Sequence, residues 1–235
     1  AFVKSTMLYD NQASDVYTAL HDKVSYADEA AIRDHYQHML DSWGDSVARA
    51  LSMLSEESLD GVQLVASTGS LSAIDEVLTR SPGVIRRLRT LPAPLLVSTP
   101  EVASTFREEG AVREILDLAR RADLTLTGMG AAAPGGSAVL AGVTTDAEVR
   151  AFAEQGAVGD MLGEWYDVEG RVVETDWSRR RLGVALDELR ELDNVVGVAG
   201  GVEKVDAIRG AIAGGLIDAL VTDEPTATAL LDRWG

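Results

Sequence analysis

The chain has 235 residues, of which 46% are hydrophobic and 25% charged, and its 21 basic and 38 acidic residues give a formal net charge of −17. Such a negative surface repels phosphate groups, which argues against direct binding to nucleic acid or to anionic membranes. The sequence has no cysteine, which excludes disulfide scaffolds, zinc–thiolate sites, iron–sulfur clusters and thiol catalysis. Neither a membrane span nor a signal peptide is recognisable, so we expect a cytoplasmic protein.

The N-terminal quarter of the chain predicts a short strand and a long helical segment. The strand is predicted at residues 2–8. In residues 28–54, apolar side chains recur at helical spacing, which indicates one long amphipathic helix or two helices with a break near Gly44. His35 and His38 lie in this segment at a spacing that can ligate a metal, but no third ligand is recognisable, so we expect no metal site.

From residue 62 onward, apolar runs that end in glycine or hydroxyl residues alternate with helical patterns. Thr145 and Glu148 form a capping box for the helix that follows them. Asp223 can cap a later helix, and Pro225 suits its first turn. Repeated strand–loop–helix units predict an α/β fold with a largely parallel sheet flanked by helices. The predicted strands are residues 62–66, 95–97, 124–127, 195–199 and 216–221.

No linker or internal repeat divides the chain, so we expect residues 1–235 to form a single domain. Residues 131–180 are rich in glycine, alanine and polar residues, and we expect them to form an inserted lobe over the sheet. The first residue is Ala1 and not Met, so we expect a processed or cloned fragment.

Three loops have the form of a ligand site. Ligands of parallel α/β sheets bind where strands end and helices begin, because unpaired backbone N–H groups and the helix dipole attract anions there. The loops are residues 67–70, 128–130 and 199–204. In the last of them, Gly200 and Gly201 permit close backbone approach to a ligand. For each loop, the alternative is that glycine and serine merely turn the chain.

Lys204 is the most informative residue of these loops. It falls in the first turn of the next helix, where the helix dipole makes a positive charge unfavourable. A bound anion beside Lys204 would explain why a cation is found there. The alternative is a solvated lysine. Elsewhere, Asp160 and Glu164 could form a carboxylate pair. The basic run at residues 179–181 is expected on a solvated face, where it could also meet an anionic ligand or partner.

A family resemblance is recognisable in the C-terminal half of the chain. It rests on residues 195–231 (VVGVAGGVEKVDAIRGAIAGGLIDALVTDEPTATALL), which closely resemble the end of the effector-binding domain of SorC-type sugar-binding transcriptional regulators. The phrases AGG-x-x-K-x-x-A-I and L-V-T-D-E-x-T-A-x-x-L-L are typical of that family. Upstream, residues 91–102, 112–130 and 156–173 match in order. The resemblance implies a fold like that of glucosamine-phosphate deaminase and ribose-phosphate isomerase.

The resemblance also implies which residues bind a ligand. Lys204 and the backbone before it would hold a phosphate, and Asp160 would accept the hydroxyl groups of a sugar. The phosphate loop of the family would be residues 67–70 or residues 44–46. Leu140 stands where some relatives have a basic residue, which favours a monophosphorylated or small sugar. The candidate ligand-binding residues are Ser67, Thr68, Gly69, Ser70, Gly130, Asp160, Gly201, Glu203 and Lys204, with Gly44, Asp45 and Ser46 as second choice.

The function that the resemblance implies is ligand binding without catalysis. The chain would be the ligand-sensing domain of a bacterial transcriptional regulator, which binds a phosphorylated sugar or polyol and passes the signal to a DNA-binding domain. No helix-turn-helix is recognisable here, and the net charge of −17 agrees with its absence. We expect a homodimer or homotetramer with no catalytic residue, cofactor or metal. The alternatives are a sugar-phosphate isomerase or deaminase on the same fold and a pure oligomerisation module.

Overall fold

The computed structural model describes residues 5–7, 47, 57, 60–70, 84, 86–140 and 142–233. Several predictions lie outside these residues. They are the helical segment at 28–54 apart from residue 47, His35, His38, the second-choice loop Gly44, Asp45 and Ser46, and the side chain of Leu140.

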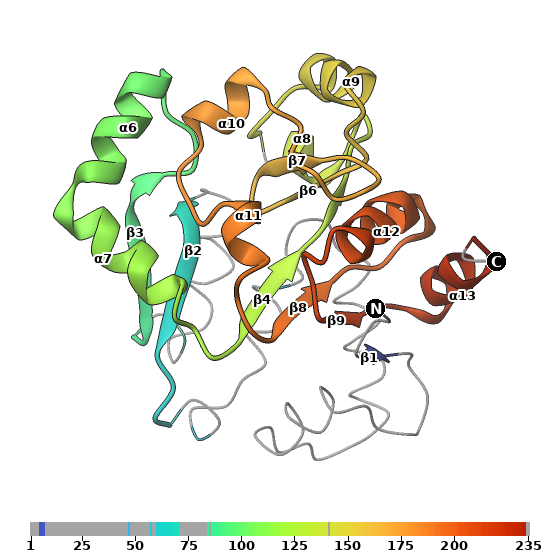
Figure 1. Cartoon of the computed structure of the whole chain (residues 1–235), viewed down its shortest axis with the longest axis horizontal. Coiled ribbons are helices and arrows are strands. Elements are labelled where there is room, and N and C mark those ends of the chain that lie inside the picture. The colour runs from blue at the N-terminus through green and yellow to red at the C-terminus, as the bar shows by residue number, and fades with distance from the viewer. Residues whose placement is uncertain are drawn as a thin grey trace.

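A four-stranded parallel sheet lies between helices in the middle of the described fold (Figure 1). Its strand order is β1-β9-β8-β4, and β8 pairs with strands on both of its sides. The strands predicted at 124–127 and 195–199 are confirmed, whereas the one predicted at 216–221 begins only at Ala219. The strands are β1 (Ser5–Met7), β4 (Thr125–Gly128), β8 (Val195–Val198) and β9 (Ala219–Val221).

Two helices, α12 and α13, follow β8 and β9 and pack against each other. The side chain of Asp223 caps α13 by accepting from the Thr226 N–H, and Pro225 lies in the first turn, as predicted. Among the described helices, none is both long and apolar enough to cross a bilayer. The elements are the 3-10 turn η1 (Val202–Lys204), α12 (Val205–Ala213) and α13 (Glu224–Asp232).

A second, two-stranded parallel sheet pairs β2 with β3, and α7 packs on both strands. Strand β3 includes Pro92 and Pro94, whereas the sequence predicted the strand at residues 95–97. Proline is tolerated there because, among the described strands, β3 pairs with β2 alone and no further strand needs its N–H groups. The elements are β2 (Leu64–Ser70), β3 (Leu88–Pro94), α6 (Pro100–Glu108) and α7 (Gly110–Ala119).

Residues 67–70 belong to β2, so the prediction that they form a loop after a strand is wrong. A distant extended segment bonds to their main chain. The Gly69 N–H donates to the Leu182 carbonyl at 3.0 Å, and the Val184 N–H donates to the Ser67 carbonyl at 2.8 Å. These bonds satisfy backbone groups that a loop would leave open, and the strand therefore continues.

A three-stranded antiparallel sheet of order β5-β6-β7 stands apart from the parallel sheets. The predicted capping box of α9 is confirmed, because Thr145 and Glu148 exchange side chain-to-backbone bonds. That residues 131–180 form a lobe of a single domain stays a prediction. The elements are β5 (Gly130–Ala131), α8 (Ser137–Leu140), α9 (Asp146–Glu154), β6 (Gly159–Met161), β7 (Glu164–Tyr166), α10 (Asp176–Arg180) and α11 (Leu186–Leu189).

Three hydrophobic clusters hold these elements together. The first joins the central sheet to α12 and includes Ile208 and Leu220, which are fully buried. The second lies between β3 and α7. In the third, the Phe152 ring centroid lies 5.0 Å from that of Trp165 and 6.3 Å from that of Trp177. The third cluster therefore anchors the antiparallel sheet to α9 and α10.

Gly170 and Gly135 form a matched pair that tests a close backbone contact. Their φ angles are +73° and +71°, but a Cβ at Gly170 would lie 2.5 Å from Gly214 Cα, whereas one at Gly135 would meet nothing within 4 Å. We expect Gly135→Ala to lower the free energy of unfolding by about 1 kcal/mol, the cost of a left-handed residue. Gly170→Ala should lower it clearly more, because the chain after β7 must also move away from α12. Urea denaturation measures both, and equal losses would contradict the contact.

Candidate ligand-binding site

The candidate site lies at the carboxyl ends of β8 and β9, in the loop that leads from β8 to α12 (Figure 1). The Gly201 N–H donates to Asp223 Oδ2 at 2.9 Å and to Thr226 Oγ1 at 2.8 Å. Asp223 also accepts through Oδ1 from the Thr226 N–H at 2.7 Å. The N-terminus of α13 therefore fixes the loop that carries Lys204.

Lys204 ends this loop and is only 5% exposed, so the alternative of a solvated lysine is wrong. Burial lowers the pKa of its ammonium group, because the charged form loses hydration. Glu203, Asp160 and Asp223 oppose this effect by their negative charge. The site therefore contains a buried cation with acidic groups around it.

Asp160 belongs to β6, where its ladder partners are Gly130 in β5 and Trp165 in β7. Burial raises the pKa of its carboxyl group to about 6 from an ordinary 3.8, and the charge of Lys204 opposes this rise. Its Oδ1 atom is buried and has no hydrogen-bond partner in the described part of the chain. A buried carboxylate oxygen without a donor is costly, so this atom is suited to accept a hydrogen bond from a ligand.

Gly159 allows β6 to approach α12 closely enough to bring Asp160 beside Lys204. A Cβ at Gly159 would lie 2.5 Å from Ala207 Cβ and 2.8 Å from Tyr166 Oη, so no larger residue fits. The Tyr166 hydroxyl donates to the Ala207 carbonyl at 3.0 Å. Burial first, and then the charge of Asp160, raise the pKa of Tyr166 well above its ordinary value. Tyr166 therefore stays neutral and ties β7 to α12.

The structure brings together five of the candidate residues named from the sequence. Strand β5 contacts η1, and α12 contacts β6. These contacts unite the residues Gly130, Asp160, Gly201, Glu203 and Lys204. The remaining four lie in β2, in the other parallel sheet, and their part in phosphate binding stays a prediction; they are Ser67, Thr68, Gly69 and Ser70.

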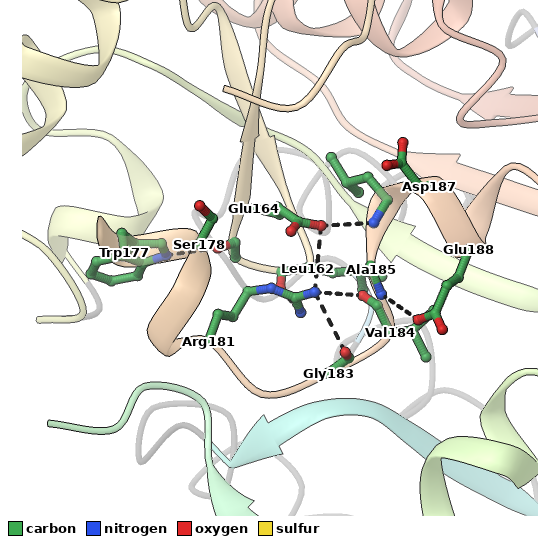
Figure 2. Close-up of polar contacts among 12 residues, drawn as sticks. Leu162, Glu164, Trp177, Ser178, Arg181, Gly183, Val184, Ala185, Asp187 and Glu188 are labelled. Carbon is green, nitrogen blue, oxygen red and sulfur yellow. Dashed lines mark hydrogen bonds and ion pairs between the residues drawn. The ribbon is translucent and has the colours of Figure 1, made fainter. Parts of the chain in front are cut away.

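Asp160 and Glu164 do not form a carboxylate pair. Glu164 is the ladder partner of Met161, so it lies on the opposite face of the hairpin from Asp160. Figure 2 shows Glu164 directed instead toward Arg181 and the start of α11. Its Oε2 accepts from the Leu186 N–H at 2.7 Å and lies 3.4 Å from Arg181 Nη2.

The prediction that the basic run at residues 179–181 lies on a solvated face is wrong for Arg181, whose side chain is 3% exposed. Three adjacent arginines give no sign that one of them is buried. Thr226, which holds Gly201, was also missed. The phrase T-D-E-x-T could have indicated it, because the first turn of a capped helix places Asp223 and Thr226 near the same point.

Comparison with known proteins decides the family. A family model described as "Putative sugar-binding domain" matches residues 10–232. The chain belongs to this sugar-binding domain family. The resemblance to the effector-binding domains of SorC-type regulators is thereby confirmed, and the sugar-binding domain accounts for nearly the whole chain.

Two relatives of this sugar-binding domain are named as transcriptional regulators. LsrR of Enterobacter sp. (strain 638) is 44% identical over 144 residues, which cover 60% of this chain and 45% of LsrR. YjhU of Escherichia coli (strain K12), an uncharacterized transcriptional regulator, is 30% identical over 196 residues, which cover 81% of this chain and 60% of YjhU. The chain thus spans about half the length of these relatives.

Solved structures of regulators share the fold. A DeoR family transcriptional regulator from Listeria monocytogenes gives a TM-score of 0.71 at 16% identity, covering 96% of this chain and 92% of its own. The full-length sorbitol operon regulator SorC from Klebsiella pneumoniae gives 0.68 at 21% identity, covering 91% and 79%. The expected α/β fold with parallel strands flanked by helices is confirmed.

Burial of Asp160 predicts how stability depends on pH. Its pKa of about 6 exceeds the ordinary 3.8, so the folded state binds this proton more tightly than the unfolded state, and stability falls as the pH rises through this range. The difference corresponds to about 3 kcal/mol. We expect Asp160→Asn to stabilise the protein by up to this amount at about pH 8 and to have little effect below about pH 4.

Urea denaturation at the two pH values measures this effect. Asp193→Asn is the matched control, because Asp193 is exposed and its replacement should leave stability unchanged at both. A gain for Asp160→Asn that does not depend on pH would show that its carboxyl group is not held in a buried site.

Proposed function

We propose that this domain senses a phosphorylated sugar or polyol, with the phosphate at Lys204 and the hydroxyl groups at Asp160. The observation that carries the proposal is the buried cation at the start of α12 opposite a buried, unpartnered carboxylate oxygen. The helix dipole and the ammonium group attract an anion at the same point. The carboxylate repels phosphate and accepts hydroxyl groups, so the two ends of the site select the two ends of a sugar phosphate.

The charges at the site argue against a second phosphate. Lys204 already faces Glu203, Asp160 and Asp223, and one phosphate adds a charge of about −1.5 to −2. A second phosphate would need a further cation beside the first, and the residues gathered at the site supply none. A monophosphorylated sugar or polyol is therefore the expected class.

We further propose that the bound state is passed to a DNA-binding domain of the same regulator, in the cytoplasm. The relatives are named as transcriptional regulators, and they are longer than this chain, since the matched residues cover only 45% of LsrR and 60% of YjhU. The isomerase or deaminase alternative has no support, because Glu164 is held by Arg181 on the other face of the hairpin and does not assist Asp160.

Replacement of Lys204 tests the phosphate end. Lys204→Met keeps the aliphatic stem and removes the charge. We expect the affinities for inorganic phosphate, glucose 6-phosphate and galactose 6-phosphate to fall together by about tenfold or more, since a charge-assisted bond contributes roughly 1.5–3 kcal/mol. Isothermal titration calorimetry measures them.

Two variants complete this experiment. Arg209→Met removes an exposed cation from the same helix and should leave the three affinities unchanged. Asp160→Asn should reduce discrimination between the two epimers more than affinity for phosphate. A thermal-shift screen of sugar phosphates precedes these measurements, because a ligand at 100 times its Kd stabilises by about 2.7 kcal/mol. No shift with any compound would favour a pure oligomerisation module and reject the proposal.

We also propose that the domain forms a homodimer or homotetramer, as the family resemblance implies. Sedimentation velocity at micromolar concentrations should give twice or four times the 25.0 kDa mass of the chain. A single species of monomer mass over the whole concentration range would contradict this assembly.

A further inference from the structure

The buried guanidinium of Arg181 joins the turn between β6 and β7 to the segment that follows Arg181 (Figure 2). The Nη1 atom of Arg181 donates to the Leu162 carbonyl at 3.0 Å, and its Nη2 donates to the Val184 carbonyl at 2.7 Å. The same Nη2 lies 3.4 Å from Glu164 Oε2, which also accepts from the Leu186 N–H. The planar guanidinium group of arginine donates hydrogen bonds in fixed directions. It therefore fixes the positions of the Leu162 carbonyl, the Val184 carbonyl and Glu164 Oε2 relative to one another.

The turn between β6 and β7 depends on this arrangement. Leu162 and Gly163 are its two central residues, with φ of 54° and 75°. Positive φ at both positions makes a turn that matches the twist of a hairpin but strains a leucine. Both carbonyls of the turn are held by buried side chains, since Leu162 bonds to Arg181 and Gly163 accepts from Trp177 Nε1 at 2.7 Å. Donors from one later segment therefore stabilise a turn that leucine disfavours.

The turn fixes where Asp160 points. Asp160 lies two residues before Leu162 and pairs with Trp165 across the hairpin. In a hairpin, the turn sets the register, and a slip of one residue would move every side chain to the opposite face. Relaxation of the turn would therefore withdraw the Asp160 carboxylate from Lys204.

We infer that Arg181 is a positioning residue of the ligand site: through the Leu162 carbonyl and Glu164 it holds the β6–β7 turn in the form that sets the Asp160 carboxylate beside Lys204. This inference rests on the proposed function for its effect on sugar binding. The main chain around Arg181 also pairs with β2, through Gly69 and Ser67. Arg181 thus links the second parallel sheet to the ligand site.

The test uses the paired variant Arg181→Met/Glu164→Gln in the full chain, because removing both charges leaves no unpaired buried ion and keeps an acceptor for Leu186. The first readout needs no ligand. The side-chain carboxyl carbon of Asp160, assigned by its loss in Asp160→Asn, is titrated by NMR. We expect its pKa, about 6 in the parent protein, to move toward 3.8 in the paired variant, because the displaced carboxyl group gains hydration. Burial is the larger influence on this pKa, so the gain of hydration outweighs the loss of the Lys204 charge, which acts in the opposite direction.

The second readout compares affinities for inorganic phosphate, glucose 6-phosphate and galactose 6-phosphate. Affinity for the preferred sugar phosphate should fall by about tenfold, with discrimination between the epimers lost and affinity for inorganic phosphate nearly unchanged. Arg180→Met is the matched control, because Arg180 is the adjacent arginine and bonds to Val97 and Asp176 but not to the turn. It should change neither readout.

An unchanged Asp160 titration and an unchanged ratio of sugar to phosphate affinity in the folded paired variant would overturn the inference. If the paired variant does not fold, Arg181→Lys replaces it. Lysine keeps the charge without the fork, and the Asp160 pKa should then move partway in the same direction; no movement would overturn the inference. If the parent protein binds none of the sugar phosphates, the proposed function fails, and the titration still decides the positioning role.

Discussion

The close approach of the antiparallel sheet to α12 is the constraint on which the candidate site depends. It depends on two glycines: Gly159 lies against the methyl group of Ala207, and Gly170, in the loop after β7, lies against Gly214, which follows α12. A side chain at either glycine would push these elements apart. Because no long, flexible side chain lies between Gly159 and Ala207, the contact fixes β6, which carries Asp160, closely against α12.

Among the residues that the structure describes, the buried pairs Glu164–Arg181 and Asp160–Lys204 differ in how their atoms are bonded. Glu164 is satisfied by a backbone N–H and by Arg181, whose guanidinium also bonds to main-chain carbonyls. At the other pair, Asp160 keeps an oxygen without a donor, beside Lys204. The Glu164–Arg181 pair is bonded mainly within the fold, although Arg181 Nε has no hydrogen-bond partner among the described residues, whereas the unbonded Oδ1 of Asp160 retains bonding capacity for a ligand.

Features encoded by neighbouring residues could be predicted from the sequence. The caps at Thr145 and Asp223 depend on contacts three residues away, and the strand at 124–127 depends on alternation. Residues 67–70 were misread as a loop because the two segments that pair with them, β3 and residues 182–184, both lie elsewhere in the sequence. The burial of Arg181 was missed for the same reason: distant groups, and not its neighbours in sequence, determine it.

The candidate site shows the same division. Lys204 was singled out from its place at a helix start, which is a local property, whereas Asp160 was identified through the family resemblance. The close contact of Gly159 with α12 could not be predicted from the residues around Asp160. Its partners, Ala207 and Tyr166, belong to other elements of the fold. The packing of β6 against α12 is therefore known only from the structure.

The double role of Asp223 has a consequence for local unfolding. One oxygen of its carboxylate caps α13 at Thr226, and the other binds the Gly201 N–H. The first turn of α13 therefore cannot fray without releasing the loop that carries Lys204, because Asp223 and Thr226 both accept from the Gly201 N–H. Amide protons at Gly201 and Thr226 are then protected by one opening event, which makes the binding loop and the last described helix a single cooperative unit.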